Sequence, residues 1–134
     1  MSTFFQQHYK KYGANGYILK CDIRKYFPSI HHDVLKNRLQ KIIPDKDILN
    51  LLFHIIDSYQ YSPNHGLPMG NQTSQLFALY YLDQLDRFIK EKLQIKHYVR
   101  YMDDLVLLSY DKDYLKKSIN SVPSLLKNTP SMLL

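Results

Sequence analysis

The fold of this 134-residue chain is decided by the stretch His97-Tyr98-Val99-Arg100-Tyr101-Met102-Asp103-Asp104-Leu105-Val106-Leu107-Leu108. Two runs of β-favouring residues flank Met102-Asp103-Asp104, and this pattern predicts a tight hairpin with two carboxylates at its tip. Like charges in a partly buried turn repel each other, so the pair favours a neighbouring cation. Asp is also an ordinary turn residue, and the interpretation therefore depends on what else lies beside the turn.

A third acid, Asp22, ends the apolar run 17–23, which is short enough to be a buried strand. If that strand pairs beside the hairpin, the oxygens of Asp22, Asp103 and Asp104 converge. Carboxylates without nearby cysteine or paired histidine favour Mg²⁺ or Mn²⁺ over zinc. Two such ions, about 4 Å apart, would activate an attacking hydroxyl and stabilise a leaving pyrophosphate in phosphoryl transfer.

The rest of the chain is predicted to be mainly helical. Apolar spacing and capping residues predict helices over 4–12, 30–43 after a Ser29 cap, 45–59 from Asp45, about 71–93 after Asn71 or Thr73, and 111–120 from Asp111. His31 and His32 are expected in the first turn of the second of these helices. We expect a small antiparallel sheet with helices packed on one face, an α+β fold.

Two pairs of charged residues in the predicted helix 71–93 have i,i+4 spacing. Asp83 with Arg87 and Asp86 with Lys90 are expected to form ion pairs on a solvated helix face.

The composition is that of a globular protein with a basic surface. Hydrophobic residues make up 45% and charged residues 22%, which excludes a disordered chain. The net charge of +6, together with twelve Tyr and six Phe, suits a polyanionic partner that can stack on aromatic rings.

The single cysteine, Cys21, excludes an internal disulfide and is expected in the core. Interrupted apolar runs argue against a membrane span, so we expect a soluble cytoplasmic protein.

Three segments resemble, in order and spacing, the central motifs of reverse transcriptases. They are Tyr101 to Asp104 between apolar strands, Asp22 to Phe27 after a strand, and Gly66 to Gln75 at the start of a helix. The resemblance covers about 17–114 and implies a polymerase palm, an RNA-directed DNA polymerase and thus a nucleotidyltransferase. It implies Asp22 and Asp103 as metal ligands, Asp104 as the third acid and an oxygen from the Ile23 carbonyl, with two Mg²⁺ ions or Mn²⁺ in their place.

The resemblance also implies where the substrates bind. Phe27 falls where the family keeps an aromatic ring under the nucleotide sugar, which would exclude a 2′-hydroxyl and select deoxynucleoside triphosphates. Further nucleotide contacts are implied for Arg24, Lys25, Pro68, Met69, Gly70 and Gln75. The RNA template and DNA primer are implied to lie against Tyr101 and Met102. Phe27 as ordinary core, and Arg24 and Lys25 as solvated bases, are the structural alternatives.

The loop from Met69 to Gln75 resembles one subgroup of this family in particular. The form Gly70-x-x-x-Ser74-Gln75, with Met69 where many family members have Gln, is similar to bacterial reverse transcriptases of diversity-generating retroelements. This similarity implies a bacterial or phage-encoded enzyme that copies RNA with low fidelity. An apolar Met69 lacks a side-chain hydrogen bond near the nucleotide, which would favour tolerance of mispairing.

The organisation leaves two functions open. About sixteen residues precede the first catalytic strand, and 121–134 loses periodicity and is expected as an irregular tail. We expect 1–134 to be one partial domain, a palm with a remnant of fingers and no thumb, whose activity depends on the missing parts or on an accessory protein. The alternative is a catalytically silent remnant that binds nucleic acid or a protein. A palm-fold cyclase is disfavoured by Phe27 and by the Gly70 to Gln75 loop.

Overall fold

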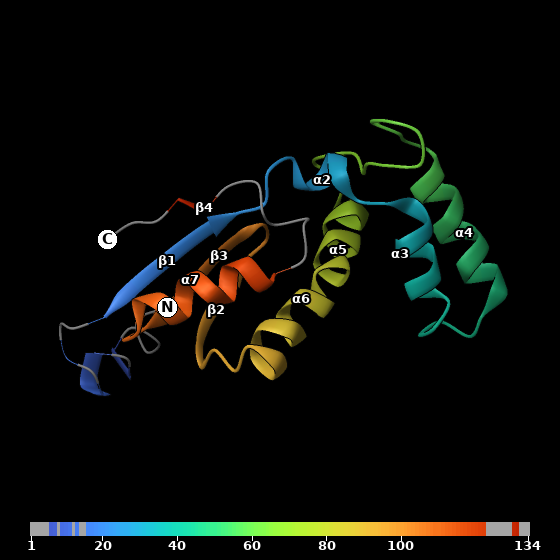
Figure 1. Ribbon diagram of the computed structural model, residues 1–134. Coiled ribbons are helices and arrows are strands. Elements are labelled where there is room, and N and C mark those ends of the chain that lie inside the picture. The colour runs from blue at the N-terminus through green and yellow to red at the C-terminus, as the bar shows by residue number, and fades with distance from the viewer. Residues whose placement is uncertain (1–5, 8, 12, 14–15, 123–129, 132–134) are drawn as a thin grey trace. The chain divides into compact units, whose positions relative to one another are not determined.

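The computed structural model describes residues 6–7, 9–11, 13, 16–122 and 130–131 (Figure 1). The chain divides into two compact units where the sequence predicted one. We call them the sheet unit, residues 1–24 and 83–134, and the helical unit, residues 25–82, and describe each by itself. Within the described part, no helix has the length and apolar character needed to cross a membrane.

The sheet unit contains a four-stranded antiparallel sheet with strand order β2-β3-β1-β4. The strands are β1 (Tyr17–Asp22), β2 (His97–Tyr101), β3 (Asp104–Ser109) and β4 (Pro130–Ser131). β3 pairs with both β2 and β1, so the predicted hairpin lies beside the predicted first strand. The sequence-based α+β fold is confirmed.

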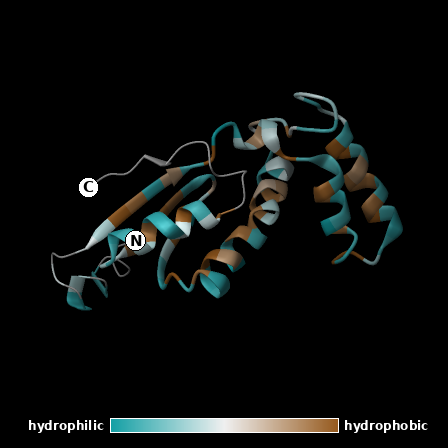
Figure 2. Cartoon of the chain, viewed as in Figure 1, coloured by the Kyte–Doolittle hydropathy of each residue, from teal (hydrophilic) through white to brown (hydrophobic). Residues whose placement is uncertain are grey.

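The strands bury one face and expose much of the other. Leu19 and Cys21 of β1, with Leu105 and Leu107 of β3, are only 1–2% exposed. In Figure 2 the middle of β1 is largely brown, the colour of hydrophobic residues, with one teal, hydrophilic band within it. Burial raises the pKa of the Cys21 thiol to about 11, because the thiolate would lose its hydration. Cys21 is therefore a core residue, as predicted.

The helices of the sheet unit are α6 (Asp83–Arg87), the π-helical turn η1 (Phe88–Lys92) and α7 (Lys112–Ser121), and residues 6–7 and 9–11 are also helical. α7 packs against β3 and buries Leu115. Its N-cap is Asp111, whose carboxylate accepts the Tyr114 N–H at 2.9 Å. The predicted start of this helix is thus confirmed.

The helical unit consists of α2 (Tyr26–Ser29), α3 (His32–Leu39), α4 (Lys46–Asp57) and α5 (Gln72–Tyr81). Asp45 caps α4 by accepting the backbone N–H groups of Asp47 and Ile48. Asn71 caps α5 by accepting the Thr73 N–H at 3.1 Å. Both helix starts agree with the sequence prediction.

The predicted helix 30–43 is shorter than expected. The Ser29 hydroxyl donates to the Tyr26 carbonyl at 2.7 Å and so ends α2 instead of capping α3. Ile30 is extended, and its carbonyl accepts the Gly66 N–H at 2.9 Å. The helix consequently begins at His32, with His31 in the cap position, and ends at Leu39.

The predicted continuous helix 71–93 is also wrong. α5 ends at Tyr81, Leu82 forms a turn, and α6 is followed by η1. The Leu93 N–H donates to the Phe88 carbonyl, an i to i+5 bond that widens the last turn. Apolar spacing alone does not separate such a turn from an α-helix, because both bring side chains back to one face.

The expected irregular tail contains regular structure. Ser121 belongs to α7, and Pro130–Ser131 pair with Cys21 and Lys20 of β1. Residues 123–129 and 132–134 lie outside the described part.

Candidate active site

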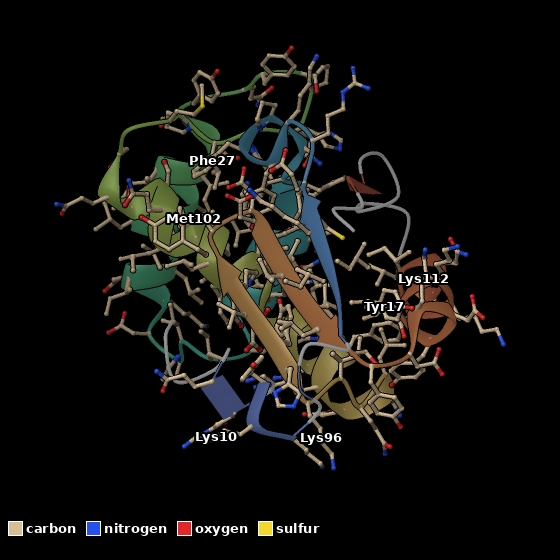
Figure 3. The ribbon with its side chains drawn as sticks, turned by 90° about the vertical axis from the view of Figure 1, so that its left-hand side faces the viewer. Lys10, Tyr17, Phe27, Lys96, Met102 and Lys112 are labelled. Carbon is tan, nitrogen blue, oxygen red and sulfur yellow. The ribbon has the colours of Figure 1, made fainter. Side chains whose placement is uncertain are left out.

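The site is built around the turn between β2 and β3. Tyr101 and Asp104 are paired across the hairpin, which leaves Met102-Asp103 as a two-residue loop. Met102 has a φ of 54°, a left-handed conformation that favours glycine at the first position of such a turn. In Figure 3 the Met102 label marks this end of the hairpin. The turn is therefore strained at the residue before Asp103.

The three predicted acids come from neighbouring strand ends. Asp22 lies directly opposite Asp104 in the β1–β3 register, and paired residues project from the same face of a sheet. Asp103 is tied to the same place by its backbone, since its carbonyl accepts the Ile23 N–H at 3.3 Å. The predicted adjacency of the first strand and the hairpin tip is confirmed at the level of the backbone.

Lys20 contributes the opposite charge. Its Nζ lies 3.3 Å from Oδ1 of Asp104, and both side chains are nearly half exposed. At that exposure the pair contributes under about 1 kcal/mol to stability. Lys20 precedes Asp22 by two residues and so shares its face of the strand. This period of two is the sequence signal that could have placed Lys20 in the site.

The donor set agrees with a hard cation in kind. Carboxylate oxygens are the ligands that Mg²⁺ and Mn²⁺ prefer, and Asp22 and Asp104 present them from one face. Among the described residues, however, no group of three or more His, Cys, Asp or Glu side chains is arranged to hold a metal ion. Metal ligation by these three acids, and by the Ile23 carbonyl, stays a prediction.

Two of the acids belong to a row of side chains that crosses the sheet from β2 to β1. Register pairs Tyr101 with Asp104 and Asp104 with Asp22, so all three share one face. Tyr101 is 76% exposed, which leaves its ring open to solvent. Arg24, just beyond β1, is exposed as well. These positions agree with the predicted primer or template contact at Tyr101 and with either interpretation of Arg24.

Within the helical unit, backbone hydrogen bonds join two of the predicted motifs. The Leu67 N–H donates to the Phe27 carbonyl at 3.0 Å, which holds the start of the Gly66 to Gln75 segment against α2. Phe27 is partly exposed and meets Tyr26 edge to face at 5.7 Å. Tyr26 is buried, and its hydroxyl donates to the Ala78 carbonyl. Tyr26, not Phe27, therefore takes the core position in α2.

The remaining predicted nucleotide residues lie on the surface of the helical unit. Met69 is 79% exposed, Gly70 and Gln75 are exposed, and Pro68 is partly exposed. Lys25 is exposed and has a φ of 51°, with its Nζ 5.9 Å from the centre of the Tyr61 ring. Their roles toward a nucleotide stay predictions.

Sequence reasoning missed one polar network. Asp86 was expected to pair with Lys90 on a solvated face, but its carboxylate accepts from Nε and Nη2 of Arg100 at 2.8 and 2.6 Å. The Tyr98 hydroxyl donates to it at 2.5 Å. The expected Asp83–Arg87 pair is present at 2.9 Å. Tyr98 and Arg100 lie two residues apart on one strand face, which is the signal that could have indicated the network.

The network shifts two pKa values. Burial raises the pKa of the Asp86 carboxyl, but hydrogen bonds from Arg100 and Tyr98 and the Arg100 charge lower it more, so it lies below 3.8. Burial, followed by the hydrogen bond to Asp86, raises the pKa of Tyr98. Asp86 is therefore held ionised between two donors.

A family model and two curated relatives are similar to this chain. The family model described as "Reverse transcriptase (RNA-dependent DNA polymerase)" matches residues 1–131. The putative COX1/OXI3 intron 2 protein of Saccharomyces cerevisiae is 28% identical over 86 residues, covering 59% of this chain and 10% of that protein. The putative intron 1 protein of the same yeast is 21% identical over 91 residues, covering 63% and 11%. This chain thus spans about a tenth of either relative.

A solved structure is similar in fold. Apo telomerase from Candida tropicalis, truncated from the C-terminal domain, matches 90% of this chain and 30% of its own with a TM-score of 0.64. At 18% identity, this similarity indicates a shared fold.

Proposed function

This chain belongs to the reverse transcriptase family, and we propose that its sheet unit is the catalytic palm of an RNA-directed DNA polymerase. The observation that supports this proposal best is the placement of the three acids. Asp22 faces Asp104 across β1 and β3, and Ile23 binds the Asp103 carbonyl. This pairing of two neighbouring strand ends supports the proposal, because two-metal nucleotidyl transfer uses carboxylates that lie close together.

In this proposal Asp22 and Asp103 bind the cations, with Asp104 as the third acid. Two Mg²⁺ ions, when bound, would supply activation of the primer hydroxyl and stabilisation of the leaving pyrophosphate. The Lys20 ammonium offsets part of the repulsion among the acids through its contact with Asp104. The exposed Tyr101 ring supports the primer or the RNA template by stacking.

The helical unit is proposed to select the nucleotide. Phe27 excludes a ribonucleotide through its ring, and the exposed Pro68, Met69, Gly70 and Gln75 offer backbone and side-chain contacts to a deoxynucleoside triphosphate. Lys25 of this unit is proposed to supply positive charge for its phosphates, and Arg24, which belongs to the sheet unit, is proposed for the same role. The net charge of +6 favours a nucleic-acid partner. Resemblance to diversity-generating retroelement enzymes stays a prediction, because the comparisons extend to the family and not to the subtype.

Primer extension on a template RNA, with Mg²⁺ and with Mn²⁺, tests the proposal. The chain is compared with Asp103→Asn and with the control Asp113→Asn, an exposed acid in the first turn of α7. Incorporation by the wild type and the control that is lost by about 100-fold or more in Asp103→Asn supports the enzyme. Equal incorporation by Asp103→Asn contradicts it.

A second candidate is a catalytically silent member that binds nucleic acid or a protein. The Lys20–Asp104 contact favours this candidate, because the lysine ammonium neutralises part of the negative charge that a bound metal cation would otherwise neutralise. Retention of a labelled RNA–DNA duplex with no incorporation by any variant, with either metal, would support this candidate over the enzyme.

A further inference from the structure

We propose that Arg100 is a positioning residue that fixes Asp103 by holding the peptide unit in front of it. Its effect on catalysis rests on the proposed function, whereas its effect on the turn does not. The proposal follows from a chain of hydrogen bonds that runs from α6 through the guanidinium to the hairpin tip.

Arg100 bridges a helix and the turn. Its side chain is only 12% exposed and projects from the face of β2 that meets α6. Nε and Nη2 bind the two oxygens of Asp86, while Nη1 donates to the Met102 carbonyl at 3.0 Å. The guanidinium is planar and rigid, so fixing one side on Asp86 also fixes the direction of Nη1.

The carbonyl that Arg100 holds belongs to the peptide between Met102 and Asp103. Met102 has a left-handed φ of 54°, which is unfavourable for a residue with a side chain. The turn would relax if the surrounding contacts allowed it. The hydrogen bond from Arg100 opposes that relaxation at the Met102–Asp103 peptide, which sets the position of the Asp103 backbone.

A second bond holds the peptide on the other side. The Asp103 carbonyl accepts the N–H of Ile23, a buried residue that directly follows Asp22. Both peptides that flank Asp103 are therefore held, one by Arg100 and one by Ile23, the residue that directly follows Asp22. This pair of bonds sets the position of one acid relative to the other.

Asp86 is itself oriented within the network. The Tyr98 hydroxyl donates to Oδ1 of Asp86, the oxygen that also accepts from Nε of Arg100. A lysine at position 100 has a single nitrogen and would not reach Asp86 and Met102 with the same fixed fork. Arg100→Lys therefore keeps the positive charge but removes the link between α6 and the turn.

The experiment uses the full chain with Arg100→Lys and the matched control Arg87→Lys. Arg87 is paired with Asp83 on the same short helix as Asp86, but its side chain is 68% exposed. Amide hydrogen exchange is measured at Ile23, and at Val106 and Leu107 farther along β3. Mn²⁺ binding is titrated by electron paramagnetic resonance.

Arg100→Lys should speed exchange at Ile23 by about tenfold, the equivalent of losing one hydrogen bond, with little change at Val106 and Leu107. A purely structural role would speed all three amides together and would overturn the proposal. Mn²⁺ binding should weaken by about tenfold, as when a supporting contact of a metal site is lost. Arg87→Lys should match the wild type in both measurements.

Two further outcomes separate this inference from the proposed function. A wild-type chain that binds no Mn²⁺ contradicts the proposed metal chemistry, while the exchange rates still decide the role of Arg100. If Arg100→Lys loses its helical circular dichroism, Asp86→Asn replaces it. The amide offers Arg100 a single acceptor oxygen, so the two-oxygen contact that fixes the direction of Nη1 is lost and exchange at Ile23 should again rise. Unchanged exchange at Ile23 in a folded variant of either kind overturns the proposal.

Discussion

Asp22 lies directly opposite Asp104 in the antiparallel pairing of β1 with β3. The two carboxylates share a face with Lys20, whose Nζ contacts Asp104 at 3.3 Å. Asp103 precedes Asp104 in the strained turn, and its backbone is bound to Ile23. Long-range strand pairing thus brings Asp22 opposite an acid that lies about eighty residues farther along the sequence.

Replacing Asp86 should destabilise the sheet unit. Asp86→Asn leaves the mostly buried Arg100 guanidinium without its carboxylate, and we expect a loss of about 2 kcal/mol in the free energy of unfolding, the size of a hydrogen bond to a charged group. The control Asp83→Asn breaks an exposed Arg–Asp pair on the same helix and should cost about 0.5 kcal/mol or less. Urea denaturation followed by circular dichroism measures both. Equal losses for the two variants would contradict the assigned network.

The same carboxyl should make stability depend on acid pH. The pKa of Asp86 lies below 3.8 in the folded chain, so its contribution is present above pH 3.8 and is lost as the pH falls through the lower folded value. Asp86→Asn should show a shallower fall in unfolding free energy below pH 3.8 than the wild type. Denaturation curves at a series of pH values test this, and parallel falls in the two chains would speak against the shift.

Gly66 and Gly70 should respond differently to alanine. Both have left-handed φ values, 105° and 87°. A Cβ on Gly66 would lie 2.7 Å from the Cβ of Tyr61, whereas one on Gly70 would meet nothing within 4 Å. Gly66→Ala should therefore cost about 3 kcal/mol or more, and Gly70→Ala about 1 kcal/mol from backbone strain alone. Thermal unfolding would refute this account if Gly70→Ala were the more damaging.

The exposed Met69 is predicted to affect fidelity. Met69→Gln adds a side-chain hydrogen-bonding group at a position that is open to solvent, and it should lower misincorporation by roughly threefold to tenfold, the effect of about one hydrogen bond. Sequencing of the products on an RNA template measures the error spectrum. Leu76→Gln, an exposed substitution of the same kind on α5, serves as the control. An unchanged error spectrum in Met69→Gln would remove the link.

The features that sequence reasoning predicted well depend on local physics. The hairpin follows from two β-favouring runs around a short turn, and Asp45, Asn71 and Asp111 cap helices because a cap needs only the next turn of chain. The start of the helix after Ser29 was wrong because Ser29 bonds backward to Tyr26. A strand as short as Pro130–Ser131 carries no period to detect.

The candidate site was predictable in its acids and not in its supports. Asp22, Asp103 and Asp104 stand out as acids among apolar strands. Asp86 has the spacing of a surface ion pair, and only the tertiary packing of α6 against β2 reveals Arg100 as its partner. The conformation of Met102 is likewise set by the two-residue loop, since methionine itself gives no signal for a left-handed φ.

Mn²⁺ titration of Asp22→Asn, Asp103→Asn and the double variant, with Asp113→Asn as control, tests the central claim most directly. If both acids hold the same cation, each single variant should weaken binding by about tenfold or more, and the double variant should lose less than the two losses combined. The control should bind as the wild type does. Wild-type affinity in both single variants would contradict a shared cation site formed by Asp22 and Asp103.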